Sequence, residues 1–205
     1  MLLDYLLPTP CVYCAKSGKP VCDSCFEQIE TEPKEVLLEG LIGYSFSNYR
    51  GHSSTLVQNI KETSYTALIP FVASLMARSW PFQEDVALVP IPSSKANYRK
   101  RGFHHTLLLS RAIAQRVPNV KVLDLLASVG NRKDQVGLSP RAREENLLGA
   151  FRVKAGAGAM TLVLLDDVLT TGATLREAAR TLADTGLAVS GFCVFAQTEP
   201  KKPSK

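Results

Sequence analysis

The chain lacks any apolar run that approaches the roughly 18 residues needed for a membrane-spanning helix. Its first eight residues, 1–8, lack a basic region and carry an aspartate, so we expect no signal peptide. Apolar residues make up 45% of the chain and charged residues 21%, proportions typical of soluble globular proteins. The two absences predict a cytoplasmic protein without membrane insertion. The length of 205 residues is enough for one hydrophobic core and a small additional unit.

Acidic residues are scarce in one part of the chain. Residues 88–154 hold 13 Lys and Arg against 4 Asp and Glu, a net charge of +9, which leaves −4 for the rest. Such a block suits a polyanionic ligand, and nucleic acid is a second possible partner. A plain solvated basic surface is the remaining alternative. Few aromatic residues interleave with the charges (Tyr98, Phe103 and Phe151), so base stacking has thin support.

Cysteine is almost confined to the N-terminus, where two C-x2-C pairs stand seven residues apart: Cys11, Cys14, Cys22 and Cys25. Four thiolates at this spacing predict one tetrahedral zinc, and a structural one, because no ligand position is left open. A segment this short cannot bury a core, so the metal would supply its folding energy. Two disulfides or a redox pair are the alternatives. The fifth cysteine, Cys193, lies in an apolar strand pattern typical of core.

Strand and helix patterns alternate after residue 40, which predicts an α/β fold with a mostly parallel sheet flanked by helices. We expect a zinc-binding module at 1–30, a polar linker at 31–40, the main domain at 41–198 and a flexible tail at 199–205. Strands are expected at 41–46, 86–89, 120–126, 151–153, 161–165 and 187–196. Helices are expected at 53–60, 66–79 and 103–116, with a basic loop at 98–102.

The apolar run ending at Leu165 leads into Asp166 and Asp167, then into a threonine-rich turn at 170–174. Thr174 and Glu177 have capping-box spacing, so we expect a helix to begin at Thr174. A strand, a tight turn and a helix N-terminus together favour a bound phosphate. The two carboxylates would repel a phosphate alone, but they suit a ligand that adds hydroxyls or a divalent cation. That combination describes a phosphorylated ribose.

A second anion site is expected after the strand at 86–89, because ligands bind at the carboxyl ends of strands in open α/β sheets. Ser93, Ser94 and the arginines of the basic loop follow that strand. His104 and His105 at the next helix start are more often surface or hydrogen-bonding residues than catalytic ones. The polar, basic stretch 131–143 is either a surface excursion or a lid that excludes water from a site.

Six stretches along the chain resemble those of one family. Residues 164–174 resemble the PRPP-binding motif of type I phosphoribosyltransferases. The other matching stretches are the four-cysteine N-terminus and residues 89–92, 101–103, 135–139 and 143–151. Together they are similar to the ComF family (ComFC/GntX-like), phosphoribosyltransferase-like proteins linked to competence and DNA uptake. The family usually has Asn-Gln where His104 and His105 stand, and Glu62 to Ser64 also differ from its pattern.

The resemblance implies a role for each motif. Asp166 and Asp167 would be the catalytic pair that holds the ribose hydroxyls, with Mg²⁺ bound mainly through the substrate. The remaining roles are the 5′-phosphate site (Thr170, Thr171, Gly172, Ala173, Thr174), the pyrophosphate site (Pro92, Ser93, Ser94, Arg99, Arg101) and the flexible loop over the reacting centre (Arg132, Gln135, Arg143, Asn146).

Three functions remain open at this stage. The first is a magnesium-dependent phosphoribosyltransferase that uses PRPP. The second is a protein that senses PRPP or a nucleotide without turnover. The third is an accessory protein of the competence machinery that holds single-stranded DNA. The acceptor substrate and the oligomeric state do not follow from the sequence.

Overall fold

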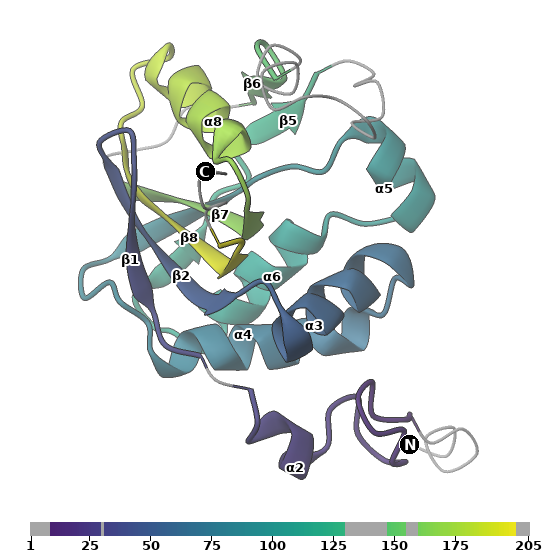
Figure 1. Cartoon of the computed structure of the whole chain (residues 1–205). Coiled ribbons are helices and arrows are strands. Elements are labelled where there is room, and N and C mark those ends of the chain that lie inside the picture. Colours follow the sequence, from purple (N-terminus) through teal and green to yellow (C-terminus); the bar gives the residue numbers. More distant parts are fainter. Residues whose placement is uncertain (1–8, 30, 130–146, 155–159, 200–205) are drawn as a thin grey trace, which may run out of the picture.

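A computed structural model describes residues 9–29, 31–129, 147–154 and 160–199 (Figure 1). The strands are β1 (Lys34–Leu38), β2 (Leu41–Asn48), β3 (Val86–Pro90), β4 (Val120–Val122), β5 (Leu126–Ser128), β6 (Phe151–Val153), β7 (Thr161–Leu169) and β8 (Val189–Gln197). The helices are α2 (Asp23–Phe26), α3 (Gly51–Glu62), α4 (Ile69–Arg78), α5 (Lys95–Arg101), α6 (His105–Ala114) and α8 (Ala173–Ala183), with a short 3-10 turn at Thr66–Leu68.

Six strands form the main sheet in the order β1-β2-β8-β7-β3-β4. All neighbouring pairs are parallel except β1 and β2, which form an antiparallel hairpin at one edge. β5 and β6 pair antiparallel as a separate ribbon. The expected α/β class with a mostly parallel sheet is therefore confirmed.

Both faces of the sheet are buried. Alternate residues of its central strands point to opposite sides, and the residues on each side pack into a separate core. On β7, Val163 and Leu165 pack into the core that contains α3, α4 and α6. Leu162 and Leu164 pack into the core that contains α8 and the β5–β6 ribbon. Figure 1 shows these two groups of helices on opposite faces. None of the helices that the structure describes is long and apolar enough to cross a membrane.

The N-terminal segment packs against α3 and α4. Tyr13 Oη donates to the carbonyl of His52 over 2.7 Å. The Phe26 ring meets Phe71 edge to face, and the Arg78 guanidinium lies 4.4 Å above the Phe26 ring centroid. Three of the four clustered cysteines are buried in the same core as α3 and α4. The cysteine segment is thus fixed to the main domain rather than held apart from it.

Four local expectations were wrong. The expected linker 31–40 contains β1, because the turn at 39–40 returns the chain along β2. The expected basic loop 98–102 lies mostly in α5, which Ser94 caps by accepting from Asn97 N. The expected strand 120–126 is split, with β4 in the main sheet and β5 in the ribbon. The strand expected to end at Leu165 continues to Leu169, so both aspartates lie within β7.

Candidate functional site

The turn between β7 and α8 is built around Gly172. Its φ of 77° lies in the left-handed region, which a residue with a side chain adopts only at a cost. Gly172 is the N-cap of α8, so the helix begins at Ala173 rather than after a Thr174 cap. Thr171 Oγ1 accepts from Ala173 N over 3.4 Å. The expected capping box is therefore wrong, but a helix N-terminus does follow the turn.

Glu177, the other half of the expected capping box, has a different role. Its carboxylate is buried and accepts from Gly149 N over 2.8 Å. It also forms a salt bridge with Arg180 at 2.8 Å. A buried carboxylate needs hydrogen-bond partners, and Gly149 N and Arg180 supply them in place of the helix's own N-terminus. Glu177 thus joins α8 to the segment that enters β6.

A pocket of about 380 Å³ lies at the carboxyl ends of β3 and β7. β3 is followed by Pro92, Ser93 and Ser94, and α5 adds Asn97 and Arg101. β7 and the turn after it supply Asp166, Asp167, Thr170 and Thr174. Tyr49, Lys61 and His105 also line the pocket. The pocket therefore unites the two anion sites expected from the sequence.

Asp167 is the most closely contacted acid of this pocket. Its Oδ2 lies 2.8 Å from Lys61 Nζ and 2.6 Å from His105 Nε2. Ser93 Oγ and Arg101 Nη1 lie 3.3 and 3.4 Å from His105 Nδ1. Because a guanidinium only donates, Nδ1 acts as an acceptor, which leaves the proton on Nε2 facing Asp167.

Arg101 is held in the same cluster by a hydrogen bond to the backbone of Lys61. Its Nε donates to the carbonyl of Lys61 over 2.6 Å, which ties α5 to the C-terminal turn of α3. Desolvation lowers the pKa of this guanidinium, although nearby carboxylates oppose the effect. Arginine stays charged in proteins at any ordinary pH, so Arg101 offers the pocket a fixed positive charge.

The two adjacent carboxylates titrate differently. Burial and the charge of Asp167 raise the pKa of Asp166 to about 7. Burial acts in the same direction on Asp167, but the charge of Lys61 and the side-chain interaction with His105 outweigh it and hold the pKa of Asp167 well below its usual range. Asp167 N donates to Asp166 Oδ1 over 2.9 Å. At neutral pH the site holds one fixed anion and one carboxyl that exchanges its proton readily.

The structure brings most of the expected site residues into this one pocket or its turn. Arg99 is the exception, because it lines a neighbouring pocket instead. Arg132, Gln135, Arg143 and Asn146 lie outside the described residues. Lys61, Tyr49 and Asn97 were not expected. Nothing in the local sequence of Lys61 marks it, since it reaches Asp167 only through the packing of α3 against the sheet.

The four N-terminal cysteines gather as a zinc site requires. Their Sγ atoms all lie within 4.8 Å of one another, and those of Cys14 and Cys22 are 3.6 Å apart. Sulfur atoms around a tetrahedral zinc with bonds of about 2.3 Å are about 3.8 Å apart. The Ser24 hydroxyl, 3.3 Å from Cys22 Sγ, lowers the pKa of that thiol to about 6, which favours the thiolate. All five cysteines are free thiols, so the cluster is compatible with structural zinc.

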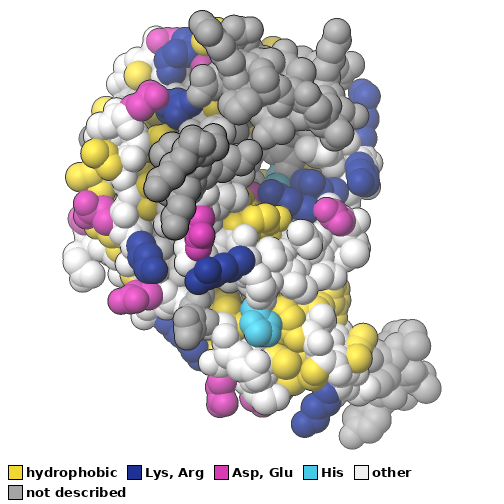
Figure 2. Space-filling view, in the orientation of Figure 1, with side chains coloured by type: hydrophobic (Ala, Val, Ile, Leu, Met, Phe, Trp, Pro, Cys, Tyr) yellow, Lys and Arg dark blue, Asp and Glu magenta, His cyan; other side chains and the backbone are white. Residues whose placement is uncertain are grey.

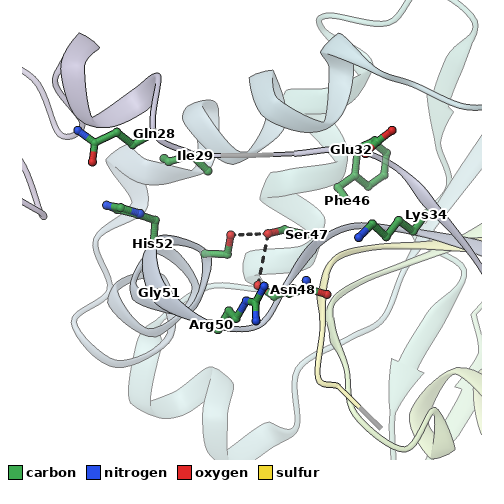
Figure 3. Close-up of a pocket in the computed structure, with 11 residues that line it drawn as sticks. Gln28, Ile29, Glu32, Lys34, Phe46, Ser47, Asn48, Arg50, Gly51 and His52 are labelled. Carbon is green, nitrogen blue, oxygen red and sulfur yellow. Dashed lines mark hydrogen bonds between the residues drawn. The ribbon is translucent and has the colours of Figure 1, made fainter.

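Another pocket, of about 280 Å³, lies between the end of the cysteine segment, β2 and the start of α3 (Figure 3). Its polar groups are largely satisfied within the protein. Ser47 Oγ contacts Ser53 Oγ at 2.6 Å, and Arg50 pairs with Glu199 at 3.1 Å. Figure 3 shows the labelled side chains spread around the opening rather than directed at one point. Nothing in this arrangement indicates a particular ligand.

Comparison with curated proteins finds relatives over most of the chain. DNA utilization protein YhgH of Salmonella typhimurium is 30% identical over 158 residues, which cover 73% of this chain and 70% of the relative. Competence protein F of Haemophilus influenzae is 24% identical over 191 residues, covering 85% and 80%. Competence protein ComFC of Bacillus subtilis is 35% identical over 121 residues, covering 58% and 46%. No family model matches the chain.

The chain belongs to the ComF family, with YhgH and competence protein F. This is the family that its motifs resemble. Among solved structures, it is similar to an adenine phosphoribosyltransferase of Thermoanaerobacter pseudethanolicus, with 14% identity, a TM-score of 0.36, and 84% of this chain and 99% of that one covered. An orotate phosphoribosyltransferase of Francisella tularensis gives 15% identity and a TM-score of 0.34, covering 80% and 64%. These scores are low, so the assignment depends on the sequence relatives.

Proposed function

We propose that this protein binds PRPP with Mg²⁺ in the pocket that contains Asp166 and Asp167, as a phosphoribosyltransferase-type protein. The observation that carries the proposal is the meeting of two anion-binding elements at one carboxylate pair. The turn after β7 and the start of α8 contribute Thr170 and Thr174 to the pocket, which Ser93, Ser94 and Arg101 also line. A ligand with phosphate at both ends of a ribose matches this arrangement in charge and in order.

Each group has a task in the proposed complex. The turn 170–174 holds the 5′-phosphate through backbone N–H groups and threonine hydroxyls. Asp166 and Asp167 accept from the ribose hydroxyls. Ser93, Ser94 and Arg101 face the pyrophosphate. Asp166 and Asp167 suit magnesium, which prefers one or two carboxylates together with substrate phosphates. The charge of Mg²⁺ would offset that of the pyrophosphate.

Transfer would break the bond between ribose C1 and the pyrophosphate oxygen while the acceptor nucleophile bonds to C1. The transition state carries positive charge on the ribose, so the two carboxylates stabilise it more than they stabilise the ground state. Arg101 stabilises the negative charge that builds on the leaving pyrophosphate. Lys61 and His105 keep Asp167 ionised and fixed in position, so that it needs no rearrangement during the reaction.

We further propose that the four cysteines bind one structural zinc, and that the protein acts in competence or DNA utilization, as the names of its relatives suggest. Single-stranded DNA binding is favoured by one observation. The chain places Lys95, Arg99 and Lys100 together on exposed α5 beside the pocket. In Figure 2, dark blue side chains lie along the right of the molecule, where Figure 1 places α5.

Release of pyrophosphate separates turnover from binding alone. The protein is incubated with PRPP, Mg²⁺ and a panel of nucleobases and amines, and Asp166→Asn serves as the inactive control. A transferase releases pyrophosphate with at least one acceptor, and the variant does not. If PRPP binds and no acceptor in the panel gives release above that of the variant, the protein is a PRPP sensor and the transferase proposal fails.

A further inference from the structure

A further pocket, of about 300 Å³, adjoins the pocket that contains Asp166 and Asp167 and has no role in the proposed reaction. We call it the second pocket. The two share Pro92 and Ser93, so the segment after β3 forms the wall between them. The remaining walls come from α5, from the start of α6 and from the β5–β6 ribbon. Its volume lies at the lower end of the range of small-molecule sites, roughly 300–1,000 Å³.

Two hydrogen-bonding atoms of this pocket are buried without a partner. In the part of the chain that the structure describes, neither His104 Nδ1 nor Ser128 Oγ forms a hydrogen bond. Each residue lines the pocket, His104 from the start of α6 and Ser128 from the end of β5. Leaving such a group unsatisfied costs about 1–3 kcal/mol, so two in one cavity indicate a polar ligand.

The charge around the pocket indicates that this ligand is an anion. Lys95, Arg99, Arg152 and Lys154 line it, against Asp124 alone among acids. Asp124 already pairs with Lys154 at 2.6 Å. Within the described ranges, Lys95, Arg99 and Arg152 have no carboxylate within salt-bridge distance. Three cations that converge on one cavity from α5 and β6 attract a phosphate or a carboxylate.

An aromatic pair indicates a flat ring in addition to the anion. The rings of Tyr98 and His104 stack with centroids 4.5 Å apart and planes 24° apart. Tyr98 remains 43% exposed, so part of its surface is open to a ligand. Pro90, Leu107 and Leu126 give the cavity an apolar part. Burial lowers the pKa of His104, so its ring is neutral at pH 7 and adds no charge to the stack.

We propose that this pocket is a second binding site, and that it takes a nucleoside monophosphate. The base would lie at the edge of the Tyr98–His104 pair, with its polar groups directed at His104 Nδ1 and Ser128 Oγ. The phosphate would be held by Lys95, Arg99 and Arg152. Occupation of the site would fix the segment Pro92–Ser93, so the ligand is coupled to the adjacent pocket through a shared wall. The site does not depend on PRPP binding next door.

Calorimetry with AMP and UMP tests the site on an Asp166→Asn background, in which the first pocket is impaired. Binding is expected to persist there and to weaken about tenfold on adding Arg152→Ala, through loss of a phosphate contact. Ser128→Ala should weaken binding severalfold without lowering the melting temperature of the ligand-free protein, because it removes an unsatisfied hydroxyl. Lys121→Ala, an exposed cation on β4, is the matched control and should change nothing.

The result that overturns the proposal is equally definite. The site is excluded if AMP and UMP do not bind to Asp166→Asn. It is also excluded if adding Arg152→Ala or Ser128→Ala leaves their affinity unchanged. Inorganic phosphate at equal affinity would remove the base from the proposal. Oligo-dT that binds while both mononucleotides do not would assign the surface to a strand instead. PRPP binding to the wild type is measured in parallel, so failure here is distinct from failure of the first site.

Discussion

Asp166 and Asp167 are neighbours in the sequence, yet the fold gives them opposite electrostatic surroundings. Asp167 points to Lys61 and His105, which hold it as an anion. Burial and the repulsion of its neighbour raise the pKa of Asp166 to about 7, although the backbone N–H of Asp167 acts in the opposite direction. One carboxylate is therefore a fixed structural charge, and the other is available to respond to a ligand.

The raised pKa of Asp166 predicts a pH-dependent penalty on folding. Between the ordinary carboxyl pKa of 3.8 and about 7, the folded chain binds more protons at this position than the unfolded chain does. Protonation of Asp166 therefore favours the folded state. This contribution to stability is fully present below about pH 3.8 and is lost as the pH rises through about 7. Asp166→Asn removes this dependence, so its melting temperature should exceed that of the wild type at about pH 8 and approach it at about pH 5.

Thermal unfolding of the two proteins in EDTA checks this prediction. Asp85→Asn, an exposed aspartate just before β3, serves as the control and should follow the wild type at both pH values. A melting temperature of Asp166→Asn that stays below the wild type throughout would mean that Asp166 is ionised and stabilising, contrary to its burial.

Residue types were predictable at this site, but their partners were not. The Asp-Asp pair, the threonines and the glycine predict a strand, a tight turn and a helix N-terminus, an arrangement that local geometry alone creates and that favours a phosphate. Lys61 and His105 lie far from Asp167 in the sequence and meet it only when α3 and α6 pack on the same face of the sheet. No local pattern encodes that contact.

At the scale of elements, the turn after β7 shows how a correct general expectation can rest on a wrong detail. The sequence predicted a strand, a turn and a helix, and all three are present. The capping box is absent because the Glu177 carboxylate accepts from Gly149 N and pairs with Arg180 instead. Similarly, the basic segment 98–102 was expected as a loop, yet Ser94 nucleates a helix there.

This correction predicts unequal effects for the two halves of the expected capping box. Glu177→Ala should lower the free energy of unfolding by about 2 kcal/mol, since it removes the charged acceptor of Gly149 N and the salt-bridge partner of Arg180. Thr174→Ala should lower it by less than about 0.5 kcal/mol, because Thr174 caps nothing. Urea denaturation measures both. Equal losses of unfolding free energy, or a larger loss for Thr174→Ala, would contradict this account and support the capping box.

At the scale of the whole molecule, three candidate sites share one scaffold: the cysteine cluster, the proposed PRPP pocket and the pocket proposed for a nucleoside monophosphate. The fold class followed from the alternation of strand and helix patterns, which depends on local periodicity. The position of the cysteine segment did not follow, because contacts such as Tyr13 with His52 join residues distant in sequence. Because this segment packs against α3, the proposed zinc would also stabilise the main domain.

Zinc content tests that link. Protein purified under reducing conditions should contain about one zinc per chain by elemental analysis. Cys11→Ser should lose the metal and melt at a lower temperature, because Cys11 is buried and the cluster packs on the main core. Cys193→Ala is the matched thiol control and should retain the zinc. Metal-free wild type, or disulfides found by thiol titration, would contradict the zinc assignment.

The proposed PRPP site has the most direct test of all. Isothermal titration calorimetry measures PRPP binding to the wild type and to Asp166→Asn, with and without Mg²⁺, using ribose 5-phosphate for comparison. The structure predicts that the wild type binds PRPP, more tightly with Mg²⁺ and more tightly than ribose 5-phosphate, and that Asp166→Asn weakens binding at least tenfold while remaining folded. PRPP that does not bind, or that binds the variant equally well, would contradict the account.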